Sequence, residues 1–254
     1  MKLAISGKGG VGKTTLAALL AQHWTRRGLE VIAVDADPDA NLASALGLPA
    51  DKTPVPISEM SELIQQRTGS KKGYGTYFTI NPDVHDIPEE FSTMVDGIRL
   101  LVLGGVQAGG AGCICPESAL LRALVTHLLL TPYQVVLLDM EAGIEHLGRA
   151  TADAVSAMVV VVEPGLRSVQ TALAVSRLAT QIGIKHLAVV FNRVPPGLDI
   201  HPLTQNLRGL PVLGRIPYDE RIAQADLLGR SIWPPGEAVA REIENIAGTL
   251  QELA

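Results

Sequence analysis

The chain has 254 residues and is 47% hydrophobic but only 19% charged, so it can bury a large core without disulfide bonds or structural metal ions. Its formal net charge is -5, and its basic residues occur in runs no longer than a pair, which argues against a nucleic-acid-binding protein. No apolar stretch approaches the ~20 residues that span a bilayer, and the amino terminus lacks the pattern of a signal peptide. We therefore expect a cytoplasmic protein that binds neither nucleic acid nor membrane.

Short apolar runs with the composition of buried strands recur along the chain, and the segments between most of them have helical spacing. The first predicted helix follows the first strand: Leu16, Leu20 and Trp24 share one face, and Gly28 is placed to end it. Apolar strands that alternate with helices are typical of a parallel sheet buried on both faces. We predict an α/β fold in one domain, residues 1–254, with a mostly parallel central sheet flanked by helices. The strands are expected at residues 2–6, 31–35, 99–103, 135–139, 158–163 and 187–192.

A glycine-rich stretch, GKGGVGKTT at residues 7–15, joins the first strand to the first helix. Glycines in this position let backbone N–H groups converge on phosphate oxygens, and the helix dipole adds to the attraction. The pattern predicts the phosphate loop of a nucleoside triphosphatase, in which Lys13 reaches the β and γ phosphates and Thr14 ligates Mg2+. The loop residues expected to contact the nucleotide are Gly9, Gly10, Val11, Gly12, Lys13, Thr14 and Thr15.

Aspartates follow two of the predicted strands. VDADPDAN continues the second strand and places Asp35 and Asp37 at a spacing of two, so both project from one face. Asp37 can simply cap the following turn, where aspartate is common. VVLLDMEAG places Asp139 at the tip of a buried strand, where a charge is costly unless it meets a cation. Mg2+ is the natural partner of Asp139, directly or through water.

Residues 49–97 break the alternation of strands and helices. They are polar and rich in proline and glycine, with one plausible helix near residues 58–67. We interpret them as an elaborated connection within the domain and as a candidate partner surface.

Both cysteines, Cys113 and Cys115, lie in the glycine-rich segment 104–118, just before a helix that Pro116 is suited to start. A disulfide across one intervening residue would close a strained ring in a reducing compartment, and the flanking glycines argue against two buried apolar thiols. Metal ligation is the favoured interpretation, because helix amino termini favour the thiolate form. Sites made only of thiolates need about four ligands, so a second copy of the chain would supply the other half.

Lys8, one residue after the first glycine of the loop, makes this the deviant form of the motif. With it the chain resembles the deviant Walker A ATPases, which include the MinD and ParA ATPases of cell division and chromosome partitioning and the iron protein of nitrogenase. The resemblance implies an ATP-dependent homodimer in which Lys8 reaches the nucleotide of the partner chain. It also implies that Asp37 positions or activates the attacking water, so that Lys8, Lys13 and Asp37 form the catalytic set.

The resemblance continues after Asp139. MEAGIE, residues 140–145, resembles the switch loop of the partitioning ATPases, with Gly143 sensing the γ phosphate through its N–H. Glu141 stands where those relatives often have proline.

The resemblance also implies where the base of the nucleotide lies. Asn192 ends the last predicted strand and matches a position that hydrogen-bonds adenine, and Arg193 follows it in the nucleotide site. Pro217 belongs to GRIPYDE, residues 214–220, which matches the loop that packs on the base.

The deviant loop, the Cys-x-Cys pair and DMEAGIEHL at residues 139–147 together resemble the nickel-insertion ATPases of the CooC type, which mature carbon monoxide dehydrogenase. The resemblance implies that Cys113 and Cys115 of two chains share one Ni2+, with Zn2+ as a competitor in vitro. It implies delivery of the nickel to carbon monoxide dehydrogenase or the related acetyl-CoA synthase.

Two alternative functions stay open. An iron–sulfur reductase component like the nitrogenase iron protein also bridges a cluster with two cysteines per chain, but those ligands lie far apart in sequence. A membrane- or DNA-positioning ATPase would need a basic helix or face, whereas the tail at residues 241–254 carries three glutamates against one arginine.

Overall fold

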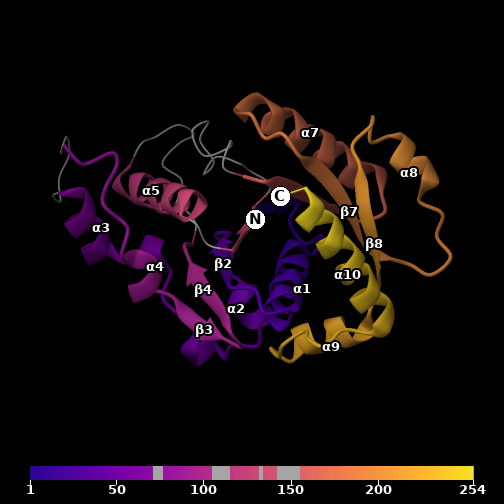
Figure 1. Ribbon diagram of the computed structural model, residues 1–254, viewed down its shortest axis with the longest axis horizontal. Coiled ribbons are helices and arrows are strands. Elements are labelled where there is room, and N and C mark those ends of the chain that lie inside the picture. Colours follow the sequence, from indigo (N-terminus) through magenta and orange to yellow (C-terminus); the bar gives the residue numbers. More distant parts are fainter. Residues whose placement is uncertain (71–76, 105–114, 132–133, 142–154, 254) are drawn as a thin grey trace.

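The structure is a computed structural model that describes residues 1–70, 77–104, 115–131, 134–141 and 155–253 (Figure 1). Its strands form one 8-stranded sheet in the order β3-β4-β2-β5-β1-β6-β7-β8. Every neighbouring pair is parallel except β3 and β4. The strands are β1 (Lys2–Gly7), β2 (Val31–Ala36), β3 (Thr93–Val95), β4 (Ile98–Val102), β5 (Val135–Met140), β6 (Ala157–Val162), β7 (Leu187–Val194) and β8 (Val212–Pro217).

The helices lie mainly between consecutive strands of the sheet. Within the part of the chain that the structure describes, none of them is both long and apolar enough to traverse a lipid bilayer. They are α1 (Lys13–Arg26), α2 (Leu42–Ala45), α3 (Ser61–Thr68), α4 (Ile87–Glu90), α5 (Pro116–Leu130), α7 (Leu166–Ile182), α8 (His201–Gln205), α9 (Glu220–Leu227) and α10 (Glu237–Glu252), with short 3-10 turns η1 (Ala50–Lys52) and η2 (Ile57–Glu59).

The predicted strands are all present, as β1, β2, β4, β5, β6 and β7, and they confirm the α/β class with a mostly parallel sheet. The sequence did not predict β3, which has 3 residues at the sheet edge, because so short a segment carries no periodic signal. It did not predict β8 either, because Gly214 and Arg215 interrupt its apolar run. The base-packing loop expected at residues 214–220 is corrected accordingly: its first part, through Pro217, is strand β8.

Helices cover both faces of the sheet, because alternate residues of each strand face opposite sides. On one face, Ile5 of β1 packs in a core with α1, α2 and α10. On the other face, Ala4 packs in a core with α3, α5 and α7. Leu16, Leu20 and Trp24 of α1 are fully buried in the first of these cores, as their spacing predicted.

Residues 49–97 contribute buried side chains to the core and one strand to the sheet. The helix predicted near residues 58–67 is present as α3, and Leu63 is buried in the same core as α5 and α7, together with Ile57 and Ile87. The segment then ends in β3, which joins the sheet edge through β4. Its use as a partner surface stays a prediction.

The carboxyl ends of the parallel strands meet along one edge of the sheet. The end of β1 lies there between β5 and β6, and residues 7–15 continue from it into α1. Ligands of open parallel α/β sheets bind at this edge, so the fold places the predicted loop where a nucleotide would be held.

Candidate active site

The phosphate loop ends at Gly12, which directly precedes α1. Gly12 has a φ of 91°, a left-handed conformation that glycine adopts without strain. A Cβ atom at this position would lie 2.1 Å from Nδ2 of Asn192, so the close approach of β7 requires a glycine here. No side chain of the described residues caps the start of α1, which leaves the N–H groups of its first turn available to an anion.

A cavity of about 600 Å3 opens in front of this loop. Its walls come from the loop and the first turn of α1, the turn after β2, the end of β7, and the segment from β8 into α9. Two residues of the predicted site, Val11 of the loop and Asp139, the expected partner of Mg2+, are buried and do not line the cavity. The predicted site residues that line the cavity are Gly9, Gly10, Gly12, Lys13, Thr14, Thr15, Asp37, Asn192, Arg193 and Pro217.

The part of the wall formed by α9 was not predicted. Ile222 and Asp226 line the cavity from this helix, and the sequence around them carries no motif that signals a ligand. Tyr218 and Asp219 also line the cavity, and they belong to the GRIPYDE stretch that is predicted to pack on the base. Asp219 caps the start of α9 and accepts the N–H of Gly236 at 2.6 Å, which ties this wall to the start of α10.

Two carboxyl groups lie side by side beneath the loop, because Asp35 of β2 and Asp139 of β5 are register partners. Asp35 accepts the N–H groups of Leu42 at 2.8 Å and Asp37 at 3.3 Å, and burial raises its pKa to about 6. Neither oxygen of Asp139 has a hydrogen-bond partner of good geometry among the described residues, although the Thr14 hydroxyl lies close enough to favour the charged form. Burial, and then the Asp35 charge, raise the pKa of Asp139 to about 7.

Asp139 thus has the character of a cation ligand. Its carboxyl group is fully buried, lacks a hydrogen-bond donor of good geometry in the described residues, and sits next to a hydroxyl on the first turn of α1. Oxygen donors of this kind suit Mg2+, and a cation would compensate a carboxylate that burial otherwise disfavours.

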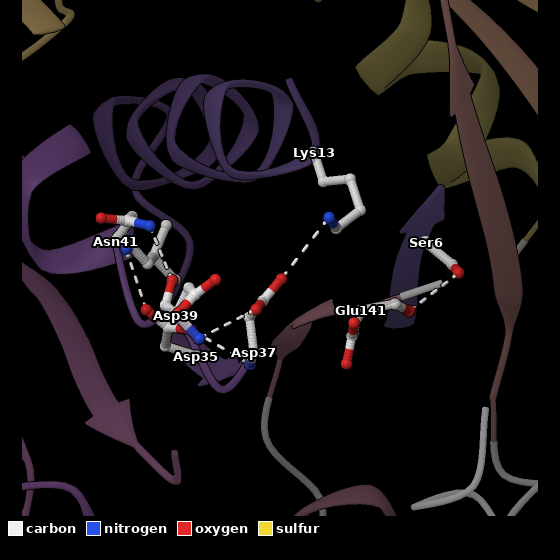
Figure 2. Close-up of polar contacts among 8 residues, drawn as sticks. Ser6, Lys13, Asp35, Asp37, Asp39, Asn41 and Glu141 are labelled. Carbon is white, nitrogen blue, oxygen red and sulfur yellow. Dashed lines mark hydrogen bonds and ion pairs between the residues drawn. The ribbon is translucent and has the colours of Figure 1, made fainter. Parts of the chain in front are cut away.

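Lys13 and Asp37 form an ion pair in the wall of the cavity. Figure 2 shows the Lys13 side chain extended from α1 toward Asp37. Nζ of Lys13 lies 3.4 Å from Oδ2 of Asp37, and the two side chains are only 6% and 15% exposed. The other oxygen of Asp37 accepts the Asp39 N–H at 3.0 Å, and the Asn41 amide donates to the Asp39 carbonyl at 2.7 Å. Asp37 therefore stabilises the turn after β2 and also contacts the loop lysine.

The end of β7 contacts the loop from the other side. Asn192 donates from Nδ2 to the Val11 carbonyl at 2.9 Å. Arg193 donates from Nη1 to the Gly10 carbonyl at 2.9 Å and lies 2.9 Å from Oε1 of Glu163, just after β6. No sequence pattern singled out Glu163, whose contact depends on the neighbouring positions of β6 and β7.

The segment after β5 begins at the cavity. The Ser6 hydroxyl donates to the Glu141 carbonyl at 3.1 Å, as Figure 2 shows, and Glu141 lines the cavity. Gly143, the predicted γ-phosphate sensor, lies outside the described residues.

Of the predicted metal ligands, Cys115 is described and Cys113 lies outside the described residues. Cys115 is the N-cap of α5: its sulfur accepts the Ser118 N–H at 3.4 Å and lies 3.1 Å from the Ser118 hydroxyl. Pro116 occupies the first turn of the helix, as predicted. The described residues of one chain contain no group of three or more His, Cys, Asp or Glu side chains arranged to hold a metal ion.

Comparison with known proteins agrees with this geometry. Residues 2–232 match the CobQ/CobB/MinD/ParA nucleotide binding domain family. The chain is 44% identical over 254 residues to the carbon monoxide dehydrogenase accessory protein CooC of Rhodospirillum rubrum, covering 99% of this chain and 97% of that protein. It is 45% identical over 257 residues to an uncharacterized ATP-binding protein of Methanocaldococcus jannaschii, covering 100% and 98%. The solved structure of the septum site-determining protein MinD complexed with Mg-ADP, from Pyrococcus horikoshii, shares the fold with a TM-score of 0.68 at 22% identity, covering 100% of this chain and 97% of that one.

Proposed function

The chain belongs to the CobQ/CobB/MinD/ParA family of nucleotide-binding proteins and is a P-loop ATPase, and from this premise we propose that it is a homodimeric nickel carrier. The family match confirms the resemblance predicted from Lys8 and residues 7–15. In this proposal the chain hydrolyses ATP with Mg2+, holds Ni2+ between two copies, and assists nickel insertion into carbon monoxide dehydrogenase or acetyl-CoA synthase. The observation that carries the proposal is the 44% identity, over nearly the full length, to the accessory protein CooC.

The side chains around the cavity fit in-line attack of water on the γ phosphate. The Lys13 ammonium would offset the negative charge that develops on the phosphate oxygens, and Asp37 would orient the attacking water. Thr14 and the unpartnered carboxyl of Asp139 would hold Mg2+, which when bound offsets phosphate charge. Asn192 and Pro217 line the cavity beyond the loop and, in this proposal, would contact the adenine.

The exposure of Lys8 is the argument for a dimer in this proposal. Lys8 is exposed and is not among the residues that line the cavity of its own chain. An exposed lysine next to the phosphate site can reach a nucleotide held by a second copy, as the family resemblance implies. Hydrolysis would then require two chains, with Lys8 of each completing the other site.

The cysteines supply the cargo site. The sulfur of Cys115 lies at the amino-terminal end of the 15-residue α5, where it accepts the Ser118 N–H. Cys113 and Cys115 give two thiolates per chain, so two chains supply the four that a soft metal ion takes. ATP binding and hydrolysis would change how the two chains approach each other, and with it the affinity of the shared site for Ni2+.

Equilibrium dialysis with Ni2+ and with Zn2+, combined with mass measurement in the presence and absence of ADP and ATP, tests this proposal. We expect about one metal ion for two chains, bound only by the dimer. Changing Cys113 and Cys115 to serine together should remove the metal and leave ATP hydrolysis intact.

Stoichiometric metal on a monomer, or full metal binding by the double serine variant, would exclude the shared site. Iron and sulfide in an anaerobic preparation would instead favour the reductase alternative. Stimulation of hydrolysis by liposomes or DNA would favour a positioning ATPase.

A further inference from the structure

Two consecutive residues at the end of β7, Asn192 and Arg193, both reach the phosphate loop. In a regular strand neighbouring side chains point to opposite faces. Here the pairing of β7 with β8 shifts register between Phe191 and Val194, which marks a β-bulge. Arg193 within it has a φ of 53°, a left-handed conformation that residues other than glycine rarely adopt. The bulge thus explains how both side chains turn toward the same loop.

The contacts of this pair orient two peptide groups of the loop. Asn192 holds the Val11 carbonyl and Arg193 holds the Gly10 carbonyl, each at 2.9 Å. In a trans peptide the carbonyl and the following N–H point in opposite directions. Holding the Gly10 carbonyl toward Arg193 therefore directs the Val11 N–H away from it, and that N–H donates to the Lys8 carbonyl at 3.4 Å. The Arg193 contact supports the turn that carries Lys8.

This support matters because Gly10 is the weak point of the turn. Gly10 is exposed and has a φ of 80°, and glycine populates both signs of φ about equally. Without a partner for its carbonyl, the Gly10–Val11 peptide can rotate, which breaks the bond to the Lys8 carbonyl and changes the direction of the Lys8 side chain.

Glu163 holds the guanidinium in place. Its Oε1 lies 2.9 Å from the same Arg193 nitrogen that contacts Gly10, and its own N–H donates to the Ser168 hydroxyl at 3.3 Å. Ser168 is in the first turn of α7. The contacts therefore run from α7 through Glu163 and Arg193 to the Gly10 peptide.

We propose that Arg193 and Glu163 are positioning residues of the ATPase, which orient Lys8 for hydrolysis by holding the Gly10 peptide. This inference rests on ATP hydrolysis and on the proposed role of Lys8, and it is independent of the metal cargo. Lys13, which would bind phosphate, pairs with Asp37, whereas Arg193 contacts Gly10 and Glu163. Loss of the guanidinium should therefore lower kcat more than it weakens ADP binding, although Arg193 also lines the cavity.

Steady-state hydrolysis without nickel, ADP titration calorimetry and thermal unfolding test the inference on Arg193→Asn, Arg193→Lys and Glu163→Gln. Asparagine tolerates the left-handed backbone, so Arg193→Asn removes the guanidinium without straining the bulge. We expect Arg193→Asn to lower kcat roughly tenfold, the scale of one lost charged hydrogen bond, with ADP affinity within about threefold of the original chain. Arg193→Lys should restore part of the rate.

A variant that combines Arg193→Asn with Glu163→Gln should be no slower than Arg193→Asn alone, because Glu163 acts through Arg193. Arg177→Ala, at an exposed arginine of α7, is the matched control and should hydrolyse normally. An unchanged kcat in Arg193→Asn, or losses of kcat, ADP affinity and melting temperature together, would overturn the inference. Lys8→Ala, measured in parallel, tests the role of Lys8 separately from the role of Arg193. Normal hydrolysis by Lys8→Ala would show that Lys8 is not needed for hydrolysis.

Discussion

The buried carboxyl of Asp139 gives the sharpest quantitative prediction. Burial raises its pKa from 3.8 to about 7, so the folded chain is most stable where this group is protonated. The stabilisation that comes from protonated Asp139 is fully present below pH 3.8 and is lost as the pH rises to about 7. Over this range the carboxyl group ionises in the unfolded chain but stays protonated in the folded chain. Between pH 5 and pH 7 this amounts to roughly 3 kcal/mol, at ~1.4 kcal/mol for each pH unit. Asp139→Asn keeps the shape and removes the charge.

Urea unfolding at pH 5, 6, 7 and 8, in EDTA and without nucleotide, measures this effect. We expect the variant to gain roughly 3 kcal/mol relative to the original chain between pH 5 and pH 8. Asp51→Asn, at an exposed aspartate of η1, should give no such gain. Mg-ADP should stabilise the original chain more than the Asp139→Asn variant, because the variant loses a carboxylate for the cation. Parallel stability curves for the variant and the original chain would refute the reasoning about burial.

Three further outcomes are expected. Lys8→Ala should abolish phosphate release while calorimetry gives an unchanged ADP affinity, and normal turnover would show that Lys8 has no role across the dimer. Gly12→Ala should weaken ADP binding by more than about tenfold, because the new Cβ would lie 2.1 Å from the Asn192 amide and because the φ of 91° at Gly12 strains alanine. Near-normal ADP binding would show that β7 moves away from the loop at little cost. Cys115→Ser should change the free energy of unfolding by less than about 0.5 kcal/mol, because serine is a good N-cap, so a large loss of stability would contradict the capping geometry.

Local interactions explain what could be predicted from sequence. The apolar runs of β1, β2, β5, β6 and β7 are long enough to identify buried parallel strands without knowledge of their neighbours. The loop at residues 7–15 could be placed because its glycines, lysine and threonine act within one strand–loop–helix unit. Pro116 and the helix that follows Cys115 were predicted for the same reason, since a helix start is set by residues next to each other.

Other features depend on contacts between segments far apart in the chain. β3 and β8 have too little apolar periodicity to be recognised alone, and each is a strand because a neighbour supplies its hydrogen bonds. Asp35 and Asp139 are 104 positions apart, and only the register of β2 with β5 makes them neighbours. The desolvation that raises their pKa values exists only once both faces of the sheet are covered.

The sequence by itself determined the parallel α/β architecture and the position of the phosphate loop, because both depend on residues that are adjacent or regularly spaced. The roles of Lys13, Thr14 and Asp37 in hydrolysis stay predictions. Tertiary structure alone decided how the loop is held. The bulge that directs Arg193 to Gly10, the placement of Glu163 beside it, and the burial of Asp139 arise from strand pairing and packing, which join residues that no local pattern connects.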